Sequence, residues 1–324
     1  MKKHLIAAAV AGAFAVPAMA QVTVSGSISV GLVNTGQPNA KRFDVTNLGG
    51  GANALSFAST EDLGGGLRGG FQGQLRFSSA TGDLAGSGTS DTGANTLHLA
   101  NVFLSGGFGT VRLGKIGESG NTAFDPWGAT GGAALMTGTG VSTLMAAGVI
   151  ANGIGYSTPS IAGFSATVGQ SVSARTNERQ VFSLDYVAGP IRLQALHARN
   201  NQNTAGVDTA APADAKITGQ SIGASYNLGV ATLMVVHVTS KNAAGAKTSD
   251  MMGIGATVPL GAVTVLAGYN KAKALGSITS ANDTKWSLGA NYALSKRTTL
   301  GADVYKAEAT NATTGMVVRA RHTF

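Results

Sequence analysis

The sequence predicts an all-β fold, a sixteen-stranded antiparallel β-barrel that crosses a membrane. Three observations predict it. Apolar and polar residues alternate in segments repeated to the last residue, tight glycine-rich turns separate pairs of these segments, and no apolar run after residue 20 is long enough for a spanning helix. The composition agrees, because 47 glycines and only 12% charged residues are typical of many strands joined by turns.

The first twenty residues have the organisation of an export signal. Residues 1–4 are a short basic start, residues 5–16 are an apolar run rich in alanine, and Ala18, Met19 and Ala20 form a small-residue cleavage site. The apolar run is shorter than the roughly 20 residues of a membrane-spanning helix. We therefore expect a signal peptide at residues 1–20 and one barrel domain at residues 21–324.

The alternation predicts which face of each strand meets lipid. Apolar and polar residues alternate over 22–32, over 67–77, over 285–292 and over 315–324. In a membrane barrel wide enough to hold water, the apolar side chains face outward and the polar ones line the lumen, whereas a narrow soluble barrel has the reverse. Residues 233–238 do not alternate cleanly, and residues 34–53 are predicted to be a polar loop.

The turns give the strand number. Tight turns are expected at residues 61–66, 106–109, 159–163, 189–190, 227–229, 259–261 and 294–298. Seven turns on one rim imply eight connections on the other, hence sixteen strands. The 304 residues left after removal of the signal give about 19 per strand with its connection, as expected for strands of about 9 to 11 residues. The sheet must close, because a bilayer offers no partner to an open edge.

Several classes of function are excluded. The chain has no cysteine, and His98, His197, His237 and His322 lack metal-ligand spacing, so neither a metal nor a cofactor is expected. Glycine-rich turns such as residues 64–66 lack the Gly-Lys-Ser/Thr of a phosphate loop, and no nucleophile, base and oxyanion group converge in the sequence. The net charge of +8, or +6 without Lys2 and Lys3, is spread out without the basic runs that bind nucleic acid.

Five segments carry a resemblance to a known family. Residues 60–67 (TEDLGGGL), 104–111 (LSGGFGTV), 156–159 (YSTP), 292–298 (YALSKRT) and the terminal 321–324 (RHTF) are similar to the general porins of Gram-negative outer membranes, most of all the beta-proteobacterial branch. The resemblance implies a homotrimer with one water-filled pore per subunit for ions and small hydrophilic solutes. It also implies a third external loop folded into the lumen, contact with outer-membrane lipid and lipopolysaccharide, and recognition of Phe324 by the assembly machinery.

The third loop is the predicted constriction. It runs from about Gly117 to Ala151, and loops of such length are usually functional or disordered. Its apolar residues 133–136 favour packing inside the barrel. At the expected constriction, acidic residues of the loop face basic residues of the wall. The resulting transverse electric field would set the ion preference. The acids are Glu118 and Asp125, and the bases are Arg68, Arg76, Arg112, Lys115, Arg319 and Arg321.

Departures from the family pattern limit the expected selectivity. Lys115 stands where the family usually places a constriction arginine, while two other customary arginines are replaced at Ala54 and near Val149. We expect weak anion preference or little selectivity. The alternative to a channel is a barrel that serves as an adhesin or structural anchor, or a secreted β-rich adhesin. The width of a sixteen-strand lumen, which admits water, favours the channel.

Overall fold

The computed structural model describes most of the predicted barrel. The described residues are 21–36, 44–46, 53–84, 97–117, 121–128, 149–172, 179–201, 216–274, 283–307 and 313–324. The predicted signal peptide at residues 1–20 and the predicted loop acid Glu118 lie outside them. Within the described ranges, no helix has both the length and the apolar character needed to cross a membrane.

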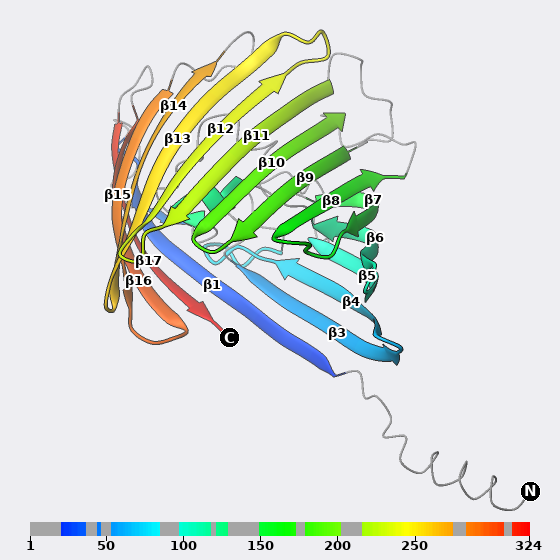
Figure 1. The fold of residues 1–324 in the computed structure, drawn as a ribbon. Helices are drawn as coiled ribbons and strands as arrows, with labels where there is room; N and C mark the ends of the chain where they lie inside the picture. The colour runs from blue at the N-terminus through cyan, green and yellow to red at the C-terminus, as the bar shows by residue number, and fades with distance from the viewer. Residues whose placement is uncertain are drawn as a thin grey trace, which may run out of the picture.

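Sixteen long strands form one antiparallel sheet, and they confirm the predicted fold class (Figure 1). They are β1 (Val22–Asn34), β3 (Ala54–Gly64), β4 (Leu67–Arg76), β5 (Leu99–Gly106), β6 (Gly109–Gly117), β7 (Val149–Ser157), β8 (Phe164–Ser171), β9 (Arg179–Ala188), β10 (Ile191–Asn201), β11 (Lys216–Asn227), β12 (Thr232–Lys241), β13 (Lys247–Leu260), β14 (Val263–Ala274), β15 (Asp283–Ala293), β16 (Thr298–Ala307) and β17 (Thr313–Thr323). All seven predicted tight turns lie between consecutive strands, from β3 and β4 to β15 and β16.

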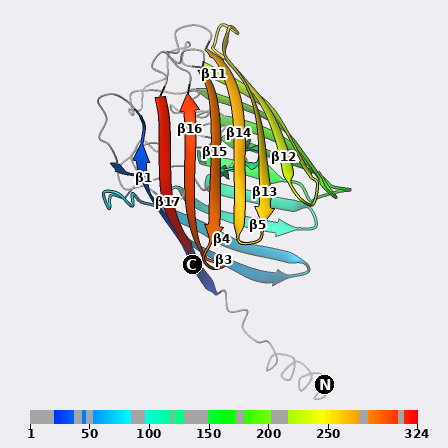
Figure 2. The same ribbon diagram turned by 90° about the vertical axis from the view of Figure 1, so that its left-hand side faces the viewer.

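The sheet closes between its first and last strands. Each strand from β3 onward pairs with the next, while β1 pairs with β3 along Val22–Ser27 and with β17 along Ser27–Asn34. Figure 2 shows β14 to β17 side by side, with β1 beside β17. At the end of the seam the backbones of Gly26 and Phe324 exchange two hydrogen bonds of 2.9 and 3.0 Å. Among the described strands, closure gives every long strand a partner on each side, so that none of them presents an open edge to lipid.

One short strand lies where the sequence predicts only a loop. β2 (Asp44–Thr46) pairs with Gly31, Leu32 and Val33 of β1. It forms there because β3 pairs only with the first half of β1, which leaves the second half of that edge open for a further segment. Residues 34–53 are therefore not entirely irregular, as the polar composition had suggested.

The two faces of the wall follow the predicted alternation. On β17, Met316 and Val318 are exposed on the outside, while the alternating residues Val317 and Arg319 are buried inside. On β15, Trp286, Leu288 and Tyr292 face outward, and Lys285, Ser287 and Gly289 face inward. Aromatic residues gather outside near the tight-turn rim, where the rings of Phe164 and Tyr186 lie 4.4 Å apart. This arrangement is typical of a barrel whose outer surface meets lipid.

The inner wall is not polar throughout. Val236 and Val238 of β12 face inward and are 1% and 0% exposed, which explains why residues 233–238 do not alternate cleanly. They belong to an inner apolar cluster: Ile116, Phe124, Trp127, Ile150, Val181, Leu196, Ala198, Val236, Val238, Met251, Leu266 and Ala272. Since the cluster includes Phe124 and Trp127 of the third loop, the wall is apolar where the loop packs against it.

Candidate functional site

The third loop enters the barrel and packs against its inner wall. It is the longest connection between successive strands, and its described part, residues 121–128, begins with the 3-10 turn η1 (Asn121–Phe124). η1 lies against β11 and β12, and the buried ring of Phe124 covers Gly223, which faces inward on β11. The guanidinium of Arg192 on β10 stacks over the same ring, 5.7 Å from its centre. Phe124 thus fixes one end of the segment to the wall.

Trp127 fixes the other end to a different part of the wall. Its indole Nε1 donates a 2.9 Å hydrogen bond to Oδ1 of Asp303 on β16, and its side chain is 1% exposed. β16 lies five strands beyond β11 around the barrel, yet Phe124 and Trp127 are only three residues apart. The segment therefore lies across the lumen, near the middle of both strands, as the resemblance implied.

Asp303 is the centre of a buried polar cluster. Its second carboxylate oxygen accepts a hydrogen bond from Nη1 of Arg319, and the two side chains are 0% and 3% exposed. Nη2 of Arg319 donates to Oδ1 of Asn291 on β15. Glycine makes room for these groups, because a β-carbon at Gly301 would clash with the guanidinium and one at Gly289 with the carboxylate. We call Asp303, Arg319, Asn291 and Trp127 the loop anchor.

Gly223 gives a first test of this packing. A β-carbon at Gly223 would overlap the ring of Phe124, so Gly223→Val pushes the loop away from β11 into the remaining opening. We expect a lower single-channel conductance and a loss of about 1–3 kcal/mol in the free energy of unfolding, as is usual for overpacking. Conductance in planar bilayers and urea unfolding check this. The neighbouring Ala224→Val faces lipid and serves as the control; equal effects from both variants would argue against the predicted contact.

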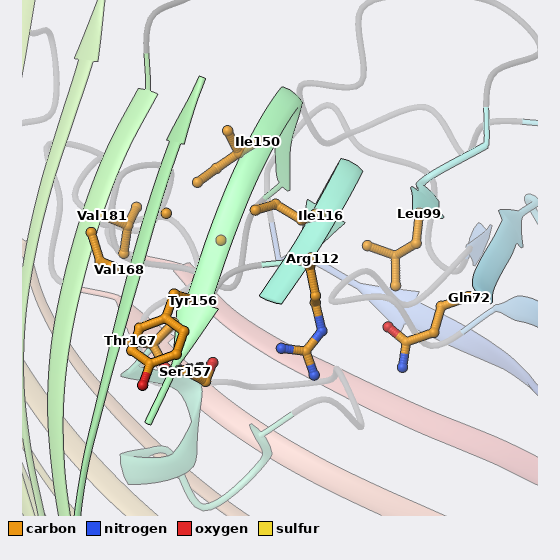
Figure 3. Close-up of a pocket in the computed structure, with 13 residues that line it drawn as sticks. Gln72, Leu99, Arg112, Ile116, Ile150, Tyr156, Ser157, Thr167, Val168 and Val181 are labelled. Atoms are coloured by element: carbon orange, nitrogen blue, oxygen red, sulfur yellow. Dashed lines mark hydrogen bonds between the residues drawn. The ribbon is translucent and has the colours of Figure 1, made fainter. Parts of the chain in front are cut away.

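A recess remains open against the wall formed by β4 to β9. It has a volume of about 320 Å³, and its lining includes Gln72, Leu99, Arg112, Ile116, Ile150 and Val181 (Figure 3). Arg112 points into the space between Gln72 and the strands of Ile150 and Val181. Within the described part of the chain, its guanidinium has neither a hydrogen bond nor an ion pair. Arg112 is therefore a cation available to a passing solute.

The other predicted wall bases occupy different positions on the inner face. Arg68 lies at the tight-turn end of β4, in register with Asp62, and Arg76 lies at the opposite end, where its Nε donates to Gln74. Arg321 on β17 is in register with Ser29 of β1. Arg319, in contrast, is held in the loop anchor. These arginines face the lumen at different levels along the barrel axis and do not converge on one point.

Lys115 does not lie where the family pattern had suggested. It is in register with Ala100, which faces outward, and it shares the parity of Leu113, which is half exposed to the outside. Arg112 and Ile116 occupy the inward positions of β6 instead. The pairing with β5 keeps residues 113 and 115 on one face, although the pairing of β6 with β7 shifts register between Gly114 and Ile116. We therefore remove Lys115 from the candidate constriction.

The loop acid Asp125 shapes the loop. Its carboxylate Oδ1 accepts the backbone N–H of Trp127 at 3.0 Å, its carbonyl accepts that of Gly128 at 2.9 Å, and the residue is 6% exposed. These bonds turn the chain so that the indole reaches Asp303. The predicted partner acid, Glu118, lies outside the described residues.

The inner face carries an excess of positive charge. Among inward-facing residues with described side chains, the bases are Arg68, Arg76, Arg112, Arg179, Arg192, Lys285, Arg319 and Arg321, and the wall acids are Asp62, Asp185 and Asp303. Asp303 is paired with Arg319, and Asp185 lies 3.9 Å from Arg192. Among the described residues, no group of three or more histidines and acids could hold a metal ion.

The sequence reasoning missed the groups that hold the loop. Asp303 could have been predicted, because it is an acid at an inward position in the middle of a strand. No sequence pattern marks Trp127, apart from its being one of only two tryptophans in the chain. The contact between Gly223 and Phe124 had no local signal, since it joins a wall glycine to a residue about a hundred positions earlier.

Comparisons with known proteins agree with this geometry. The profile of a family described as Gram-negative porin matches residues 7–312. The chain is 33% identical over 286 residues to outer membrane porin protein 32 of Delftia acidovorans, covering 81% of this chain and 77% of that protein. It is 28% identical over 280 residues to a Bordetella pertussis outer membrane porin, covering 73% and 69%. The anion-selective porin from Comamonas acidovorans superimposes with a TM-score of 0.76 at 24% identity, over 94% of this chain and all of that one.

Proposed function

The chain belongs to the Gram-negative porin family, and from that premise we propose that it is an outer-membrane channel for passive diffusion of ions and small hydrophilic solutes, with a weak preference for anions. The observation that carries the proposal is the third-loop segment anchored across a closed sixteen-strand barrel, beside an open recess that contains Arg112. A porin is a channel protein and not an enzyme.

The proposed path runs along the wall of β4 to β9. Residues 121–128 occupy the side of β10 to β12 and β16, so a solute passes on the other side of the loop, beside Arg112. The loop sets the size limit. The excess of inward-facing bases raises the local concentration of anions, and no energy source is needed. We propose that Arg112, Arg68, Arg76 and Arg321 supply this field, while Arg319 and Asp125 hold the loop in place.

The remaining partners are proposals that rest on family membership. We infer a homotrimer in contact with outer-membrane lipid and lipopolysaccharide, delivered by the outer-membrane assembly machinery. Support for a role of Phe324 in assembly comes from its place at the seam, where its backbone completes the pairing of β1 with the chain end. We also propose that residues 1–20 are removed as a signal peptide.

Liposome swelling tests the proposal. The refolded protein is inserted into vesicles, which are diluted into isotonic neutral sugars of increasing size and then into anionic and cationic solutes of matched size. We expect swelling without an energy source, slowing as the solute grows, and faster for the anion. A folded, inserted barrel that admits none of the solutes would contradict the channel and leave the adhesin or anchor role.

A further inference from the structure

The open recess beside β4 to β9 has two chemically different sides (Figure 3). In that view the polar side chains lie in the lower half and the aliphatic ones in the upper half. The polar side includes Gln72, Arg112, Ser157 and Thr167, and the aliphatic side includes Leu99, Ile116, Ile150 and Val181. Among the described residues that line the recess, Arg112 is the only charged one. A solute held here would therefore meet one cation and an aliphatic surface together.

Two groups on the polar side are unsatisfied. Within the described part of the chain, neither the guanidinium of Arg112 nor the side-chain amide of Gln72 has a hydrogen bond or an ion pair. The hydroxyls of Ser157 and Thr167, in contrast, already bond to each other at 3.1 Å. A guanidinium fork matches the geometry of a carboxylate or a phosphate, and an amide nitrogen beside it adds a further donor. The polar side therefore fits an oxyanion.

Glycines on β7 and β8 make room for the aliphatic side. A β-carbon at Gly155 would lie 2.8 Å from Cδ1 of Ile116, and one at Gly169 would lie 2.7 Å from Cδ1 of Ile150. The two isoleucines therefore pack closely against the wall, and they present only their edges to the recess. Leu99 on β5 is half-buried and offers more of its surface. Since this packing holds the aliphatic side in place, a ligand need not order it.

We propose that the recess binds small monocarboxylates that carry an aliphatic tail. The carboxylate accepts hydrogen bonds from Arg112 and Gln72, and the tail lies against Leu99, Ile116 and Ile150. The inference rests on the proposed function and deepens it, because it names the class of anion that the same passage holds.

Charge and volume define this class. A phosphate or a dicarboxylate brings up to two negative charges, whereas the described lining residues supply one positive charge. A polyhydroxylated anion would press its hydroxyls against aliphatic side chains and lose their hydrogen bonds to water. A cavity of about 150 Å³ holds benzene, so a recess of about 320 Å³ has room for about six carbons with their carboxylate.

The expected signature is an affinity that rises with tail length at constant charge, the opposite of the order set by size exclusion. Full burial of one methylene strengthens binding about fourfold, and the recess is open on one side, so we expect about twofold per methylene. Hexanoate, with four methylenes more than acetate, should then bind about 16-fold more tightly. Gluconate has the same charge and carbon number as hexanoate but carries hydroxyls, and it should bind no more tightly than acetate.

Methyl NMR of the refolded barrel in neutral detergent measures these affinities. With isoleucine methyl groups labelled, acetate, butyrate, hexanoate and gluconate are titrated, and the shifts of Ile116 and Ile150 give a Kd for each. Ile222 is 67% exposed on the outer face and reports entry of the tail into the detergent. We expect saturable shifts at Ile116 and Ile150 and no saturable shift at Ile222.

Three variants separate the two sides of the recess. Leu99→Asn should lower the preference for hexanoate over acetate about two- to fourfold, because it removes part of the aliphatic side. Arg112→Gln should weaken all the carboxylates at least fourfold, about the effect of one unit charge 5 Å away in water, and keep the dependence on tail length. Ile217→Asn removes a partly buried aliphatic side chain from β11, on the side that the loop occupies, and should change neither.

The ligand series on the native protein decides the question even where a variant does not fold. Equal affinity for acetate and hexanoate, gluconate binding as tightly as hexanoate, or an unchanged tail preference in folded Leu99→Asn would overturn the proposal. Conductance separates it from the channel function, since the NMR titration does not need an open channel. A barrel that binds hexanoate at Ile116 and Ile150 without conducting would end the channel proposal alone, whereas a conducting barrel with no tail preference would end the carboxylate site alone.

Discussion

Asp303→Asn is expected to lower the free energy of unfolding by about 3–5 kcal/mol, the usual cost of removing one partner from a buried ion pair. The carboxylate of Asp303 is fully buried against Arg319, and an amide would leave that guanidinium without its counter-charge. The same change weakens the hold on Trp127, so we also expect larger current noise from the open channel. Urea unfolding and single-channel recording measure the two effects.

Asp185→Asn is the matched control for this loss. Asp185 also faces an arginine on the inner wall, but it lies 3.9 Å from Arg192, and the side chains of Asp185 and Arg192 are 18% and 43% exposed. A pair that is open to water contributes about 0–1 kcal/mol. A loss of stability in Asp303→Asn no larger than in Asp185→Asn would show that the loop anchor does not stabilise the barrel.

Arg112→Gln is expected to give the largest loss of anion preference among single neutral substitutions on the wall. Within the described part of the chain, Arg112 lacks a charge or hydrogen-bond partner, and it stands in the open recess. One unit charge about 5 Å away in water changes the energy of an ion by about 0.8 kcal/mol, about fourfold in local concentration. We therefore expect the anion-to-cation permeability ratio to fall about two- to fourfold at 0.1 M salt, where the screening length is about 10 Å.

Lys115→Gln is the control for Arg112→Gln. The two residues are three positions apart on β6 and carry the same charge, but register places Lys115 on the outer face. We expect its reversal potential in a salt gradient to match that of the native channel. A shift caused by Lys115→Gln and none caused by Arg112→Gln would return the constriction to the position that the family pattern had suggested.

Much of the fold could be predicted from the sequence because a bilayer allows few solutions. Strands such as β15 and β17 must alternate to put lipid on one side and water on the other, so the pattern of Trp286, Leu288, Met316 and Val318 fixes their faces. Turn glycines then fix the strand number. The same rule applied to β6 places Lys115 outside with Leu113, whereas the family position places it at the constriction.

The loop anchor could not be predicted in this way. Phe124 and Trp127 lie outside any periodic segment, and their partners are on strands far away in the sequence. The apolar inward residues of β12 were a sign that something covers the wall, since Val236 and Val238 would otherwise face water. Which segment covers them is settled by tertiary packing and not by a local pattern.

We infer that the anchored third loop leaves a water-filled passage with an excess of positive charge. The most direct measurement is the reversal potential of single native channels in a planar bilayer with a salt gradient across it. We expect stable conducting steps and a reversal potential with the sign of anion preference. A folded, membrane-inserted barrel that never conducts, or one whose reversal potential has the sign of cation preference, would contradict it.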